Sequence, residues 1–148
     1  MADPLVLKTD DGDHLTIEVL ARMHPDSRDH WDGNWMVSPV TLRIGGFAGR
    51  IEAGLRMNEL VGLREGLEKV LQRRDGTAEL ESMEEWLSLQ VSFEPELGLT
   101  ARGQAVADPA TGTKLVFGLE ALNQSDLRVW IDRLRAIEAE FPLLDGDT

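Results

Sequence analysis

The sequence has no cysteine, which excludes a disulfide framework, a thiolate zinc site and a cysteine nucleophile. It also has no run of about 18 apolar residues, the length that a membrane-spanning helix requires. Basic residues are few: the chain has 15 Lys and Arg and 27 Asp and Glu, which gives a net charge of −12. Phosphate contacts require clustered positive charge, so this balance argues against a nucleic-acid-binding protein.

The length and the hydrophobic content of the chain suffice for one hydrophobic core. The chain has 148 residues, of which 42% are hydrophobic, and a chain of this size usually forms one domain. The N-terminus, Met1-Ala2-Asp3-Pro4, has no basic region before an apolar stretch, so we expect no signal peptide and a soluble, cytoplasmic protein. We expect one domain over residues 1–142 and an acidic, disordered tail over residues 143–148.

Two hairpins are predicted in the first half of the chain. Residues 4–22 contain turn residues followed by a strand in which apolar and polar side chains alternate. Residues 40–56 form a second hairpin around Gly45-Gly46, a dipeptide that suits a type I′ turn because both residues tolerate positive φ. The alternation in its return strand places Arg56 on the polar face.

The spacing of apolar residues then changes to that of an amphipathic helix. This helix begins at the N-cap residue Asn58 and ends at Asp75-Gly76. Gly62 and Gly66 each lower its helix propensity by about 1 kcal/mol relative to Ala, and they allow another element to approach closely.

The second half repeats this plan. Alternating strands are predicted over residues 87–93, 99–105 and 115–119, and a second amphipathic helix runs from Ser125 to Pro142. The fold class is therefore α+β, a mostly antiparallel sheet with two amphipathic helices in the order strands, helix, strands, helix. This order fits an internal duplication or two ordinary meanders, and both remain open. The apolar stripes predict four buried residues: Leu63, Leu67, Trp130 and Leu134.

The first candidate for chemistry is the polar loop before the second hairpin. Its His24, Asp26, Asp29 and His30 are residue types that bind divalent metals, but their spacing matches no ligand pattern with a known mechanism. Turns and helix caps also use such Asp residues, so we expect no metal here. An enzyme or metal protein built on His24–Asp32 is the least favoured of three functions.

Other enzymatic sites are not supported. There is no Gly-x-Ser-x-Gly for a nucleophilic serine, and the Gly-rich stretch 45–49 lies between strands rather than before a helix. Carboxylate pairs are abundant, as in any acidic protein, and nothing marks one pair as buried. We therefore predict a non-catalytic protein without a cofactor.

Tryptophans and acidic residues supply the candidate binding residues. Trp31 and Trp35 flank Asp32-Gly33-Asn34 and could anchor a partner, since tryptophan is enriched in interface hot spots, or could fix the loop to the core. The acidic surface could serve solubility alone or could dock a basic partner. Its candidate cluster comprises Glu79, Glu81, Glu84 and Glu85.

The segment Trp31-Asp32-Gly33-Asn34-Trp35 and the order of elements around it resemble the WapI-type immunity proteins of bacteria. The resemblance covers roughly residues 14–142, from the strand beginning at Leu15 to the closing Glu138-Ala139-Glu140-Phe141-Pro142. It implies a cytoplasmic, non-enzymatic protein that binds and neutralises a cognate polymorphic toxin, and several such toxins carry RNA-cleaving domains. The matching residues Trp31, Asp32, Asn34 and Trp35 are either partner contacts or structural.

Two functions lead. The first is an immunity protein whose acidic surface binds a basic toxin domain. The alternative is a structural or binding module without a toxin partner, such as a homodimer formed through a strand edge or a helix face. Neither function involves nucleic acid or a membrane.

Overall fold

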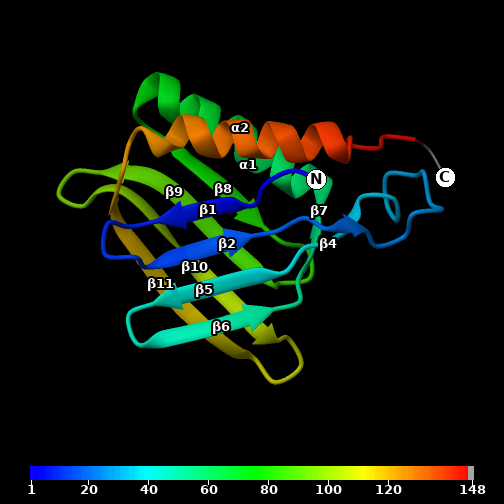
Figure 1. Cartoon of the computed structure of the whole chain (residues 1–148), viewed down its shortest axis with the longest axis horizontal. Helices are drawn as coiled ribbons and strands as arrows, with labels where there is room; N and C mark the ends of the chain where they lie inside the picture. The colour runs from blue at the N-terminus through cyan, green and yellow to red at the C-terminus, as the bar shows by residue number, and fades with distance from the viewer. Residues whose placement is uncertain (147–148) are drawn as a thin grey trace.

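The computed structural model describes residues 1–146 and contains two four-stranded antiparallel sheets, two helices and a smaller sheet (Figure 1). The first large sheet has the strand order β1-β2-β5-β6, and each half of it is a hairpin. Its strands are β1 (Leu5–Lys8), β2 (His14–Ile17), β5 (Val40–Ile44) and β6 (Phe47–Ile51).

The second large sheet is a meander in the order β11-β10-β9-β8 that lies behind the first (Figure 1). Its strands are β8 (Thr77–Glu81), β9 (Leu87–Glu94), β10 (Gly98–Asp108) and β11 (Thr113–Leu122). Helix α1 (Met57–Arg73) follows the first sheet in the chain, and helix α2 (Asp126–Glu140) follows the second. The predicted α+β class and its order of strands, helix, strands, helix are confirmed.

A three-stranded sheet lies at one end of the molecule, with the order β3-β4-β7. It comprises β3 (Ala21–Arg22) and β4 (Trp35–Val37), which lie in the chain between the two hairpins of the first large sheet, and β7 (Gly54–Arg56), which follows the second hairpin. The predicted return strand 47–56 is therefore two strands in two sheets. The Trp31–Trp35 segment connects β3 to β4 of this small sheet, and β7 leads directly into α1.

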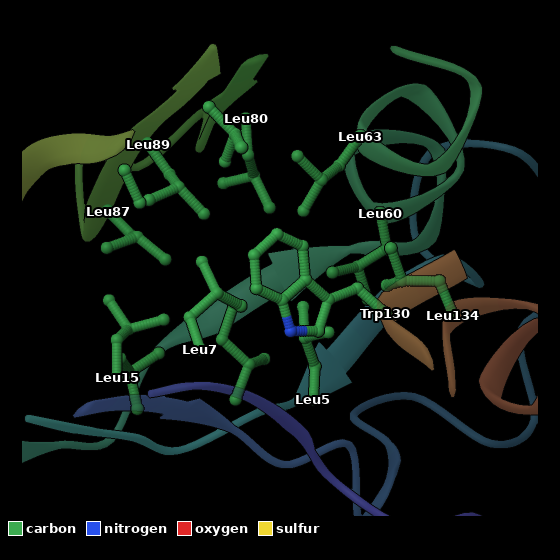
Figure 2. Close-up of a cluster of buried hydrophobic side chains, with 14 of the residues drawn as sticks. Leu5, Leu7, Leu15, Leu60, Leu63, Leu80, Leu87, Leu89, Trp130 and Leu134 are labelled. Atoms are coloured by element: carbon green, nitrogen blue, oxygen red, sulfur yellow. The ribbon is translucent and has the colours of Figure 1, made fainter. Parts of the chain in front are cut away.

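The core fills the space between the two large sheets and the helices. Figure 2 shows Trp130 of α2 surrounded by leucines from both sheets and from α1. Its indole Nε1–H donates a hydrogen bond to the carbonyl oxygen of Val6 at 2.9 Å, so the polar atom of this buried ring is paired. Leu63, Leu67, Trp130 and Leu134 are each at most 2% exposed, as the apolar stripes predict. Among residues 1–146, no helix is long and apolar enough to cross a membrane.

Two local expectations are wrong, and one strand was not expected. Of the two turn glycines only Gly45 has a positive φ, +60°, which suits a type II′ turn rather than the type I′ turn expected. The N-cap of α1 is Arg56, not Asn58, because the side chain of Glu59 accepts a hydrogen bond from the Arg56 backbone N–H at 2.7 Å. Strand β8 was not predicted, since its sequence reads as a run of charge.

Residues 143–146 of the expected tail include groups that are hydrogen-bonded to the loop before β4. Leu144 exchanges two hydrogen bonds with the side chain of Asn34, and the carbonyl oxygen of Gly146 accepts one from the His30 N–H at 3.0 Å. Gly146 also forms a parallel bridge with Asp29. Residues 143–146 therefore lie against the loop before β4, whereas residues 147–148 of the expected tail are outside the described part of the chain.

Gly66 and Gly62 of α1 have different surroundings. A Cβ on Gly66 would lie 2.8 Å from the Cα of Ala78 in β8, so the helix can approach the strand only because this residue has no side chain. A Cβ on Gly62 would meet nothing within 4 Å. The expected close approach therefore occurs at Gly66 alone.

These two glycines form a matched pair for mutation. We expect Gly62→Ala to raise the free energy of unfolding by about 0.5–1 kcal/mol, because Ala is the better helix former and has space. Gly66→Ala should lower it by about 1–3 kcal/mol, because α1 must move away from β8. Urea denaturation of the two variants checks this, and equal effects of both substitutions would contradict the packing described.

Candidate protein-binding surface

The loop between β3 and β4 is held by the side chain of Asn34, which is fully buried. Its Nδ2 donates to the carbonyl oxygens of His30 and Leu144, each at 2.8 Å, and its Oδ1 accepts from the Leu144 N–H at 2.9 Å. The Asn34 carbonyl oxygen accepts from the N–H of Met57, the first residue of α1, at 2.9 Å. Asn34 therefore joins the loop and the C-terminal residues through its side-chain amide, and the start of α1 through its backbone carbonyl oxygen.

Asp29 and Gly33 shape the turn within this loop. The Asp29 carboxylate is buried and accepts hydrogen bonds from the N–H groups of Asp32 and Gly33 at 3.1 and 3.2 Å. A Cβ on Gly33 would lie 2.6 Å from the carbonyl oxygen of Asp29, so only glycine fits. The Asp29 carboxylate thus serves the turn, while the neighbouring Asp32 is exposed.

The four candidate metal ligands, His24, Asp26, Asp29 and His30, do not form one site. His24 and Asp26 are exposed, and His30 Nδ1 lies 3.2 Å from the carbonyl oxygen of Leu144. Across residues 1–146 no group of three or more His, Cys, Asp or Glu side chains could hold a metal ion.

Arg56 is the residue that sequence reasoning missed. Alternation placed it on a solvent-facing side, yet it is only 2% exposed. Its guanidinium carbon lies 5.3 Å from the centre of the Trp31 ring and 5.2 Å from that of Trp35, so the cation contacts two aromatic faces. Its NH2 group donates to the carbonyl oxygens of His30 and Trp31 at 2.7 and 3.2 Å.

Glu59 connects this loop to the turn between β8 and β9. One carboxylate oxygen accepts from the Arg56 N–H, and the other accepts from the N–H of Met83 at 2.7 Å. Burial raises the pKa of Glu59, and the nearby charge of Glu84 raises it further, while the two backbone hydrogen bonds act in the opposite direction. The tryptophan loop and the β8–β9 turn therefore lie at the same end of the molecule.

The predicted acidic cluster lies on β8 and on this turn. Ala78 and Leu80 of β8 point into the core, which turns Glu79 and Glu81 outward. Glu84 and Glu85 lie in the turn, and all four glutamates are exposed. Among residues 1–146 none of them forms an ion pair, whereas Glu68 and Glu94 do. No ion pair within this part of the chain therefore neutralises the cluster, although the Glu81 carboxylate accepts a hydrogen bond from the Ser88 hydroxyl at 2.7 Å.

Two apolar side chains are exposed at this end of the molecule. Trp31 is 60% exposed although one face contacts Arg56, and Met83 is 55% exposed within the acidic turn. Trp35 is only partly exposed. Of the residues singled out from the sequence, Trp31, Asp32 and the four glutamates present side chains to solvent, while Asn34 is buried and Trp35 is partly buried. We name the set Trp31, Asp32, Met83, Glu84 and Glu85 the acidic-tryptophan surface.

The fold and this surface define a compact α+β domain with an acidic, partly apolar exposed end. The model of the immunity protein WapI-like family matches residues 6–142, and the chain therefore belongs to this family of immunity proteins. Among curated proteins, none matches the chain. A chain in the crystal structures of Trypanosoma bruciei MRP1/MRP2 is similar, with a TM-score of 0.50 and 15% identity, covering 95% of this chain and 86% of that chain. At this identity, the similarity concerns the fold alone.

Two asparagines test the structural role of the loop. We expect Asn34→Ala to lower the free energy of unfolding by about 1–3 kcal/mol, because partly buried backbone groups of Leu144 and His30 lose their partner. Asn58→Ala should leave stability unchanged or raise it slightly, since the buried Oδ1 of Asn58 has no hydrogen-bond partner among residues 1–146 and Ala is a better helix former. Chemical denaturation measures both, and a neutral Asn34→Ala would show that the loop is held otherwise.

Proposed function

We propose that this protein is a non-catalytic immunity protein that neutralises a cognate toxin by binding a basic domain of it through the acidic-tryptophan surface. The family supports a toxin-neutralising role. The observation that carries the finer proposal is the exposed glutamate cluster, which forms no ion pair among residues 1–146 and lies at the same end of the molecule as the exposed Trp31 and Met83. A basic substrate groove, as an RNA-cleaving domain would present, has the complementary charge.

The arrangement suits an interface in which apolar anchors are surrounded by charge. Trp31 offers a large rigid ring whose other face is already fixed by Arg56, so little side-chain entropy is lost on binding. Hot spots in protein interfaces are enriched in tryptophan, and the residues around them exclude water. Glu84 and Glu85, in a turn held by Glu59, would supply long-range attraction to a basic partner.

The proposal gives the exposed residues specific roles. Trp31 and Met83 are the proposed anchors, and Asp32, Glu79, Glu81, Glu84 and Glu85 provide charge complementarity. The buried Asn34 and the partly buried Trp35 act by positioning Trp31. The alternative, a binding module without a toxin partner, has the same surface but no requirement for a basic partner.

We expect Glu84→Lys/Glu85→Lys to slow association with the toxin domain encoded beside this gene by about tenfold or more at physiological salt, while changing the dissociation rate less. The reason is the loss of electrostatic steering, which is screened beyond about 8 Å. Stopped-flow or surface plasmon resonance at several salt concentrations measures both rates.

The matched control is Glu96→Lys/Glu120→Lys, which makes the same change in net charge with two exposed glutamates near the β9–β10 turn. Equal slowing by both double variants would mean that net charge, not this surface, governs association. Failure of the protein to bind any such domain or to rescue growth on co-expression would refute the immunity function and favour the module without a toxin.

A further inference from the structure

Strand β6 is an open edge of the first large sheet. Among residues 1–146 it pairs only with β5, and in Figure 1 it forms the lower edge of the front sheet, away from the helices. At the opposite edge α2 packs against β1, where Trp130 donates to the carbonyl oxygen of Val6. In the second sheet α1 packs against β8 at Gly66. An unpaired edge presents free N–H and C=O groups to another extended chain.

The β6 edge is regular and carries an exposed aromatic side chain. The strand has no proline, and its register with β5 is continuous from Ile44↔Phe47 to Val40↔Ile51. The pairing of β11, an edge of the second sheet, is by contrast irregular near both of its ends. Phe47 is 68% exposed. A regular edge of this kind is a template for pairing with a further strand.

The free backbone groups of β6 follow from the geometry of its hairpin. β5 and β6 are joined by the two-residue turn Gly45-Gly46, so Ile44 and Phe47 form the closing hydrogen-bonded pair. In an antiparallel ladder such pairs alternate with non-hydrogen-bonded ones. Ala48 and Arg50 therefore direct their N–H and C=O groups away from β5, toward the position of a further strand.

An apolar cleft of about 250 Å³ lies beside this edge, between β6 and the β10–β11 hairpin. Phe47, Ile51, Ala105 and Leu115 line it together with other side chains. Gly49 leaves room there, because a Cβ on it would meet nothing within 4 Å. The cleft has space for apolar side chains from one face of an added strand.

The polar face of the same edge is electrically balanced. Arg50, the only charged residue of β6, forms ion pairs with Glu52 at 2.8 Å and Glu18 at 3.7 Å. Arg43 lies on this face opposite Ala48. These four charges cancel, so this face favours neither an acidic nor a basic segment. In a chain with a net charge of −12, such a surface allows two copies to approach with little repulsion.

The sequence of β6 is complementary to itself. One antiparallel register pairs all five of its residues with those of a second copy, and in it Gly49 lies opposite Gly49. Ala48 then forms a hydrogen-bonded pair with Arg50 of the second copy, so that the two arginines are not directly opposed. On the cleft face, Phe47 of each copy lies opposite Ile51 of the other, which covers both exposed rings.

We propose that two copies of this chain pair through β6 about a two-fold axis at Gly49 and join their four-stranded sheets into one continuous sheet. This symmetric pairing uses both open edges, so assembly stops at the dimer. An edge of five residues is a small interface, and we expect a reversible dimer with a Kd of roughly 10–100 µM. The pairing uses neither Trp31 nor the glutamate cluster and does not depend on the proposed toxin binding.

Sedimentation velocity over a range of concentrations around this Kd tests the proposal. We expect a monomer–dimer equilibrium that Phe47→Ser weakens about tenfold or more, because the apolar contact with Ile51 is lost. Ala48→Pro should weaken it by a similar factor, since it removes an outward N–H without breaking the β5–β6 ladder. The matched control is Val116→Ser on β11, which removes an apolar side chain that is 70% exposed and should leave the dimer unchanged.

A single cysteine tests the register, because the chain has none of its own. At the axis the two Gly49 residues form a non-hydrogen-bonded pair with Cα atoms about 4.5 Å apart, a separation that a disulfide spans. We expect Gly49→Cys to cross-link two copies under mild oxidation at least about tenfold faster than Gly62→Cys, an exposed control on α1 where a Cβ also has space.

The proposal is overturned if the wild type remains monomeric over the whole concentration range, or if Gly49→Cys cross-links no faster than Gly62→Cys. It is equally overturned if a dimer forms that neither Phe47→Ser nor Ala48→Pro weakens, because the copies would then meet through another face.

Discussion

The guanidinium of Arg56, held between two tryptophan rings, is the interaction on which the candidate surface depends. A buried cation is costly unless its charge and its N–H groups are compensated. Here the rings of Trp31 and Trp35 compensate the charge and two loop carbonyl oxygens accept from the NH2 group, while the buried Nε–H has no hydrogen-bond partner among residues 1–146. Each cation–π contact contributes about 0.5–2 kcal/mol. Because the partners come from the loop, the loop must stay in place for Arg56 to remain buried.

Arg56 is also the point where three parts of the chain meet. Its backbone N–H is capped by Glu59, whose other oxygen holds the β8–β9 turn, and Asn34 binds the first residue of α1 together with the C-terminal residues. These hydrogen bonds thereby fix the position of the exposed Trp31 relative to the exposed glutamates of the turn. Such preorganisation lowers the entropic cost of binding a partner.

The periodicity of the sequence was sufficient to predict the α+β class, both helices and most strands, because each has a buried face. Strand β8 was missed because only Ala78 and Leu80 face inward, so glutamates dominate its pattern. Arg56 was missed because alternation predicts one solvent-facing side for a strand. In the structure the chain passes into a different sheet before β7, and the tryptophan loop covers that side. Contacts between distant segments of this kind leave no local pattern. The resemblance identified the loop residues but not which of them are buried.

The most direct test of this account is hydrogen–deuterium exchange of Arg56→Lys, which keeps the charge but loses the planar group that stacks and donates to two carbonyls. We expect faster exchange in residues 28–34 and 143–146, with the strands β9 and β10 as protected as in the wild type. Unchanged exchange in the loop, or an equal increase over the whole chain, would contradict the central role of Arg56.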